Sequence, residues 1–425
     1  MLSKIIFGAL VCVIVFTPIP YGTVEPWWKA AFVCAVFSVF ILAICDSIRV
    51  NSWSTLLPLL ALTLLAFVQS WTRISADSFQ TGFFALQMLA LTIYLALLYR
   101  YAATEDRVRI LIYTVIGVAV ASAIFGILRE TTQQQTGFVL PLLKPNQGFA
   151  QFVNSNHFAY LMEMAFGLGI GLIIAGRNNK DRVMIHVALL LPIWVGLVLS
   201  NSRGGILAML TQVVIAALLF MSFRSAGART PRLIALRAAL ILVLVVGVVV
   251  GTLWIGGDRL VSTIEASGTD LSANTAIDRA GASRNEIWRA SVKLFAAHPV
   301  FGVGLGAYWP GISAHHDASG ALVPQEAHND YLELLASGGL VGLVFGVWFS
   351  VSVFRLARQQ LWSSTGFMRA ARLGAVVGIA GVAVHSLFDF GLHLLSNAVV
   401  FLTLIMIATT QIDSQKVVDL KVQRH

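Results

Sequence analysis

The sequence is poor in charged residues, which make up only 12% of its 425 positions. Soluble globular chains contain about 25% charged residues, most of which they carry on the surface that faces water. Hydrophobic residues make up 57% of this chain instead. The composition therefore excludes an ordinary soluble globular protein and indicates an integral membrane protein.

Cysteine is also scarce. The three cysteines, Cys12, Cys34 and Cys45, all fall inside apolar segments and form no CxxC pair. The chain consequently lacks both a disulfide framework and a cysteine-based metal motif. We expect these three residues to take part in packing only.

The basic residues give the chain a net charge of +9. They are spread through loops and no nucleic-acid-binding motif accompanies them, so we expect no nucleic acid partner. Most of the 29 Lys and Arg residues fall in alternate loops. By the positive-inside rule, this bias predicts a multi-pass protein with both ends in the cytoplasm.

Long apolar runs recur along nearly the whole chain. A helix of about 20 apolar residues crosses the roughly 30 Å hydrocarbon layer of a bilayer. The first run lacks a small-residue cleavage pattern, so we expect a membrane helix there rather than a signal peptide. The pattern predicts an all-α polytopic membrane protein with about twelve transmembrane helices, over residues 3–20, 29–46, 54–70, 82–99, 108–127, 157–176, 183–200, 204–223, 234–255, 331–354, 370–391 and 394–411.

One loop is too long to be a simple connector. Residues 256–330 are predicted to form a periplasmic subdomain with short helices. It separates helices one to nine, in residues 1–255, from helices ten to twelve and a cytoplasmic tail, in residues 331–425. Within the loop, Ser283 and Glu286 form a capping box that predicts a helix over SRNEIWRASVKLF.

Polar residues at membrane depth are costly and usually mark function. In this chain they gather near the outer ends of the predicted helices, whereas a transporter usually places its site near the midplane. The pattern therefore favours chemistry at the outer leaflet. The residues concerned are Asn154, Asn156, His157, Glu163, Arg203, His328, Asn329, Asp330, Glu333, His385, Asp389 and His393.

Three basic residues on the outer side stand at predicted helix starts, namely Arg203, Arg284 and His328. A helix N-terminus presents unpaired N–H groups and the positive end of the helix dipole to an anion. Gly204 and Gly205 would let an anion approach the backbone beside Arg203. Two arginines that converge there would suit a diphosphate, because a guanidinium binds phosphate oxygens in pairs.

Three stretches around these residues resemble the O-antigen ligase and polymerase family. HNDYLELLASGGLVG has the family's histidine, polar residue and two small residues at His328, Asn329, Gly339 and Gly342. SNSRGG, and SRNEIW followed by HPVFGVGLGAY, are similar to the family's two arginine-bearing stretches. The resemblance covers roughly residues 145–410, and the first five helices match only in hydropathy.

The resemblance implies a metal-independent glycosyltransferase without a cofactor in the bacterial inner membrane. Such enzymes take a glycan from an undecaprenyl diphosphate carrier at the periplasmic face and give it to an acceptor glycan or to lipid A-core. Arg203 and Arg284 match the family's diphosphate-binding arginines, and His328 matches its histidine. We expect His328 to accept the proton of the attacking hydroxyl, because histidine titrates near neutral pH.

Other residues near the outer face are predicted to bind substrate: Asn154, Asn156, Arg289, Asn329 and Asp389. Asn329 has a second interpretation, as the cap of helix ten. His385, Asp389 and His393 are spaced to share one helical side, where they would bind the acceptor sugar or form hydrogen bonds within the bundle.

Each assignment has a simpler alternative. Arg203 could extend to lipid phosphates, and Arg284 and His328 could be ordinary interfacial residues. His315, His316, Glu326 and His328 match no structural zinc spacing, so we expect no metal. The competing function is a transporter of lipid-linked saccharide or polysaccharide that forms no bond.

Overall fold

The computed structural model describes residues 1–44, 46, 53–132, 148–176, 179–224, 284–315 and 325–412, with short pieces between 235 and 250. Within these residues the chain is helical, and its one β-bridge joins Phe149 to Phe152. The predicted all-α class is confirmed. Its helices are α1 (Leu2–Phe16), α2 (Pro26–Ile44), α3 (Trp53–Trp71), α4 (Ser78–Tyr101), α5 (Glu105–Thr132), α6 (Ser155–Gly176), α7 (Lys180–Leu199), α8 (Arg203–Arg224), α11 (Arg284–Ala297), α12 (Tyr308–Ile312), α13 (Asp330–Ser363), α14 (Gly366–His385), the short 3-10 helix η1 (Gly391–His393) and α15 (Leu395–Thr409).

Within the described residues, nine helices are long and apolar enough to span a membrane. The apolar helices α1 and α15 are shorter, at 15 residues each. Every predicted span except 234–255 corresponds to one of these helices, and half of that segment lies outside the described residues. The multi-pass architecture therefore follows from hydropathy and helix length together.

Two predicted boundaries are wrong. The tenth predicted span continues to Ser363, and the eleventh ends at His385 instead of residue 391. The chain turns at that point, because the N–H groups of Ser386 and Phe388 bond back to the last turn of α14. Asp389 and His393 consequently lie beyond the helix, so the predicted helical row of His385, Asp389 and His393 does not form.

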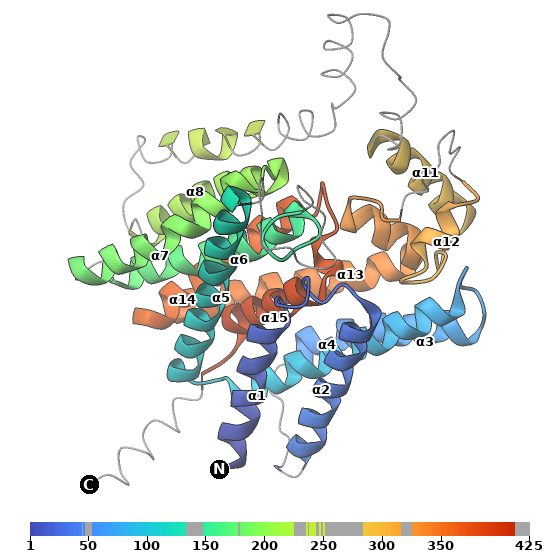
Figure 1. Cartoon of the computed structure of the whole chain (residues 1–425), viewed down its shortest axis with the longest axis horizontal. Coiled ribbons are helices and arrows are strands. Elements are labelled where there is room, and N and C mark those ends of the chain that lie inside the picture. Colours follow the sequence, from blue (N-terminus) through green and yellow to red (C-terminus); the bar gives the residue numbers. More distant parts are fainter. Residues whose placement is uncertain are drawn as a thin grey trace, which may run out of the picture.

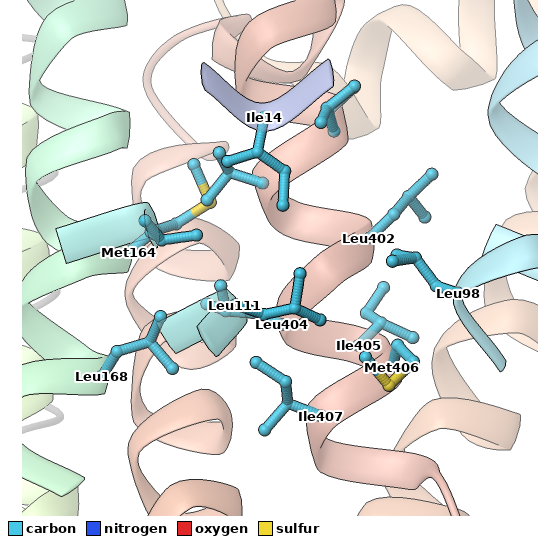
Figure 2. Close-up of a cluster of buried hydrophobic side chains, with 14 of the residues drawn as sticks. Ile14, Leu98, Leu111, Met164, Leu168, Leu402, Leu404, Ile405, Met406 and Ile407 are labelled. Carbon is cyan, nitrogen blue, oxygen red and sulfur yellow. The ribbon is translucent and has the colours of Figure 1, made fainter. Parts of the chain in front are cut away.

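Helix α15 lies in the middle of the bundle (Figure 1), and all of its residues except the half-buried Phe401 are buried. Figure 2 shows Leu402, Leu404 and Ile407 of this helix surrounded by apolar side chains of α1, α4, α5 and α6. Several of its polar groups are paired inside the core, and the hydroxyl of Thr403 lies 3.0 Å from the hydroxyl of Tyr94. A helix buried on every side needs such partners, because no water reaches it.

Helices α6 and α14 approach so closely that their backbones touch. A Cβ on Gly167 would lie 2.5 Å from the Gly378 nitrogen, and a Cβ on Gly171 would lie 2.5 Å from the Ala370 carbonyl oxygen. Small residues at such a crossing let membrane helices pack tightly. The polar residues that α6 and α14 carry are therefore brought within direct reach of one another.

The glycine-rich stretch after α11 docks onto a break in α13. Gly339 adopts φ 63° and ψ −163°, which interrupts the helix. The freed carbonyl groups of Ala336 and Ser337 accept hydrogen bonds from Val303 and Gly304 at 3.1 and 3.0 Å. This glycine-rich stretch therefore has a structural role, since it completes the hydrogen bonding of the kinked helix.

We expect Gly339→Ala to destabilise the protein, because only glycine adopts this backbone conformation without strain. A Cβ at this position would also lie 2.4 Å from the Val300 carbonyl oxygen. The free energy of unfolding should fall by about 1–3 kcal/mol or more. This loss should appear as a lower melting temperature in detergent. Gly117→Ala is the matched control, because a Cβ there meets nothing within 4 Å. Equal melting temperatures for the two variants would contradict this account of the kink.

Candidate active site

A cavity of about 300 Å³ brings together four of the residues predicted from the sequence: Asn156, Arg203, Arg284 and Asp389. These residues come from α6, α8, α11 and the turn after α14, so up to 233 positions of the chain separate them. The other described residues around the cavity are Asn201, Gly204, His385 and Phe388. Two cations from two helix starts therefore face one small polar space.

Arg203 is the first residue of α8, as predicted. The Ser202 hydroxyl accepts a hydrogen bond from the Gly205 N–H at 3.1 Å and so caps the helix. Neither Gly204 nor Gly205 has room for a side chain. A Cβ on Gly204 would meet the His385 ring, and a Cβ on Gly205 would meet Ala159. These glycines therefore allow neighbouring side chains to pack closely around the start of α8. The sequence predicts that an anion, and not side chains, takes this space.

His328 stands beside the cavity in a left-handed backbone conformation, with φ 50°. Its Nδ1 atom lies 3.4 Å from Asp389 Oδ1, and its side chain is 32% exposed. The ring also meets the edge of Phe390 at a centroid distance of 4.9 Å. The histidine is thus held on one side by a buried carboxylate and remains accessible on the other.

Asn329 caps α13, which agrees with one of its two predicted roles. Its Oδ1 atom accepts a hydrogen bond from the Leu332 N–H at 2.9 Å, and its Nδ2 group donates to the Leu387 carbonyl at 3.1 Å. The Asp330 N–H donates to the Ser386 carbonyl at 3.0 Å. The start of α13 is consequently fastened to the turn that carries Asp389, and this fixes His328 relative to Asp389.

The environment keeps Asp389 ionised. Burial raises the pKa of this carboxyl. Its contact with His328 and its electrostatic interaction with His157 lower the pKa by more than burial raises it, so the net pKa lies below its usual range. The carboxylate of Asp389 faces Nδ1 of His328 and so orients the ring with Nε2 turned away from Asp389. A carboxylate beside a catalytic histidine acts in this way in hydrolases with a Ser-His-Asp triad.

Three residues predicted to bind substrate are not among those that line the cavity: Asn154, Arg289 and the capping residue Asn329. Asn154 precedes α6, where its Oδ1 atom accepts a hydrogen bond from the Asn156 N–H at 2.8 Å. Arg289 is exposed on α11. On the same helix, the Trp288 indole donates to the Ala327 carbonyl at 3.0 Å and ties α11 to the segment before His328.

A second polar cluster lies on the other side of Phe390 and was not recognised in the sequence. His393 Nδ1 lies 3.3 Å from Glu326 and 3.5 Å from Glu333, and its Nε2 lies 3.4 Å from Asp330. All four residues border a cavity of about 840 Å³. Because His393 follows the three carboxylates by 60 positions or more, no local spacing could have predicted this cluster.

The carboxylates around His393 favour its charged form. Burial lowers the pKa of His393, but Glu333 and Glu326 raise it by more, so the net pKa is well above its usual value. Glu326, Glu333 and His393 offer ligand atoms within 4.8 Å of one another, which is compatible with a metal ion. This set shares Glu326 with the histidine-rich set weighed in the sequence, and His316 of that set lies outside the described residues.

Comparison with known families supports the resemblance seen in the motifs. A sequence model of the family described as O-antigen ligase matches residues 187–347. The matched region contains Arg203, Arg284 and His328, and it ends before Asp389. The match supports the O-antigen ligase and polymerase family, whose members carry out glycan transfer in membranes. No curated protein matches the chain.

We expect His393→Gln to lower the melting temperature, by an amount that depends on pH. Because the pKa of His393 is raised in the folded state, protonation of His393 stabilises the fold. This stabilisation is complete at pH values below the ordinary histidine pKa of 6.5, and it is lost as the pH rises through the pKa of the folded state. The difference from the unchanged protein should therefore be largest near pH 6 and should shrink toward pH 10. His298→Gln, at an exposed position, should show no such trend. A difference that grows with pH would refute the charged state of His393.

Proposed function

We propose that this protein transfers a glycan from an undecaprenyl diphosphate carrier to an acceptor hydroxyl at the periplasmic face of the bacterial inner membrane. The observation that carries the proposal is the cavity that joins Arg203 and Arg284 to Asp389, the carboxylate partner of His328. The family match supports glycan transfer of the O-antigen ligase and polymerase type. The positive-inside bias supports two cytoplasmic termini and an outward-facing site.

The chemistry needs a base for the acceptor and a stable leaving group from the donor. His328 Nε2 takes the proton of the attacking hydroxyl, whose oxygen then forms a bond to the sugar C1 atom. The C1–O bond to the carrier breaks, and its electron pair stays on the diphosphate. Arg203 and Arg284 stabilise that charge in the transition state, which needs neither a metal nor a cofactor in this proposal.

The acceptor is a further part of the proposal. Both a growing glycan chain and lipid A-core present a free hydroxyl, so polymerisation and ligation share the same chemistry at His328. In either case the carrier lipid would remain in the outer leaflet while its diphosphate enters the cavity. A transporter without chemistry remains the second candidate, and the test below separates it from an enzyme.

We expect His328→Ala and Arg203→Ala each to reduce glycan transfer by at least about 100-fold, because each removes a group that acts in the transition state. The assay uses purified protein, a lipid-linked oligosaccharide and candidate acceptors. It measures released undecaprenyl diphosphate and new glycosidic product together.

Matched controls come from the same side of the protein. His298→Ala and Arg73→Ala change exposed residues of the same types, and they should retain nearly full activity. Product formation at the normal rate in His328→Ala or Arg203→Ala would refute the role of that residue. Movement of the lipid-linked saccharide by the unchanged protein without bond cleavage would instead establish the transporter.

A further inference from the structure

We propose that His385, positioned by Glu163, forms a further contact to the carrier diphosphate in the cavity that holds Arg203 and Arg284. The inference rests on the proposed function and adds a residue to the leaving-group side of the site. His385 lies outside the segment that matches the family model, which ends at residue 347. The assignment therefore depends on this chain's own geometry.

The imidazole of His385 is held rigidly between α6 and α14. Its Nδ1 atom lies 3.0 Å from Glu163 Oε2, and the two side chains are 1% and 0% exposed. The ring of Tyr160 stacks on the imidazole, with centroids 4.1 Å apart and planes 18° apart. A histidine fixed by a carboxylate and an aromatic face presents its other nitrogen in one defined direction.

That other nitrogen has no partner within the described residues. Nε2 of His385 is buried and forms no hydrogen bond to any described group, although the residue lines the cavity with Arg203 and Arg284. A buried polar atom left without a hydrogen bond destabilises the folded protein. An oxygen atom of a ligand in the cavity would remove this cost.

Gly204 lets this nitrogen reach the start of α8. A Cβ at position 204 would lie 2.6 Å from His385 Nε2, closer than real contacts allow. The absence of a side chain therefore lets the imidazole sit against the start of α8, next to Arg203. The glycine predicted to admit an anion thus admits the histidine that we expect to contact the anion.

The surroundings favour a phosphate oxygen as the partner. Two arginines border the cavity, and its one carboxylate among the described lining residues, Asp389, is in contact with His328. One proton lies between Nδ1 and Glu163, and in this proposal Nε2 carries a second proton. Nε2–H then donates a hydrogen bond to a diphosphate oxygen. The proton stays on His385, and the electron pair of the broken C1–O bond stays on the diphosphate.

The variants that test this separate the two nitrogens of His385. In His385→Asn, the amide can replace Nδ1 toward Glu163 but cannot reach the position of Nε2. In His385→Gln, the longer amide can approach the position of Nε2. His186→Asn is the control, because His186 is also buried and bonds Tyr113 at 3.1 Å in a different part of the bundle.

The measurements are melting temperature, kcat and KM for transfer, and Kd for undecaprenyl diphosphate and undecaprenyl monophosphate. We expect His385→Asn to keep its melting temperature, to lower kcat roughly 100-fold as the loss of one transition-state donor does, and to weaken diphosphate binding more than monophosphate binding. His385→Gln should restore part of kcat. Glu163→Gln, which keeps a hydrogen-bonding group but replaces the carboxyl group that faces Nδ1, should lower kcat and leave KM nearly unchanged.

The outcomes distinguish this inference from the proposed function. If the unchanged protein transfers glycan and His385→Asn matches it in kcat and in both Kd values, the inference is overturned and the function stands. A melting temperature lowered without any selective loss of diphosphate binding would also overturn it, because the pair would then only join two helices. If the unchanged protein transfers no glycan, the proposed function is wrong. The inference about His385 is then decided by binding alone, namely by whether His385→Asn weakens diphosphate binding more than monophosphate binding.

Discussion

The close contact between α6 and α14 is the constraint on which the site depends. Glycines on both helices remove the side chains that would hold the backbones apart. Their approach places Glu163 at hydrogen-bond distance from His385. It also fixes the end of α14, so that the following turn presents Asp389 to His328. In a membrane interior, where water cannot satisfy polar groups, such pairs form only when packing brings their helices together.

The site contains two histidine–carboxylate pairs with the same orientation. In each pair Nδ1 faces a buried carboxylate, Asp389 for His328 and Glu163 for His385. His328 is partly exposed, which suits a base that receives an acceptor hydroxyl. His385 is enclosed at the cavity with the arginines, which suits contact with the leaving diphosphate. The difference in exposure therefore assigns different proposed tasks to similar chemical groups.

Helix ends explain why part of the site could be predicted from the sequence. Arg203 begins α8 and Arg284 begins α11, and the residue after His328 caps α13. Caps, glycines and the edges of apolar runs are local signals, so the sequence placed these residues at one face. Arg289, in contrast, lies on a helix in the expected segment but points to the exposed side. The capping residue Ser283 lies outside the described residues.

The sequence alone determined the membrane class, nearly all the described helices and the motifs that carry the cations and the histidine, because hydropathy and capping act over a few neighbouring residues. Only the tertiary structure decided that α14 ends at His385, that Asp389 reaches His328, and that His393 gathers three carboxylates. These pairings join residues far apart in the chain. They depend on how closely two helix backbones approach and on which face each helix buries. Neither property can be predicted from a local sequence pattern.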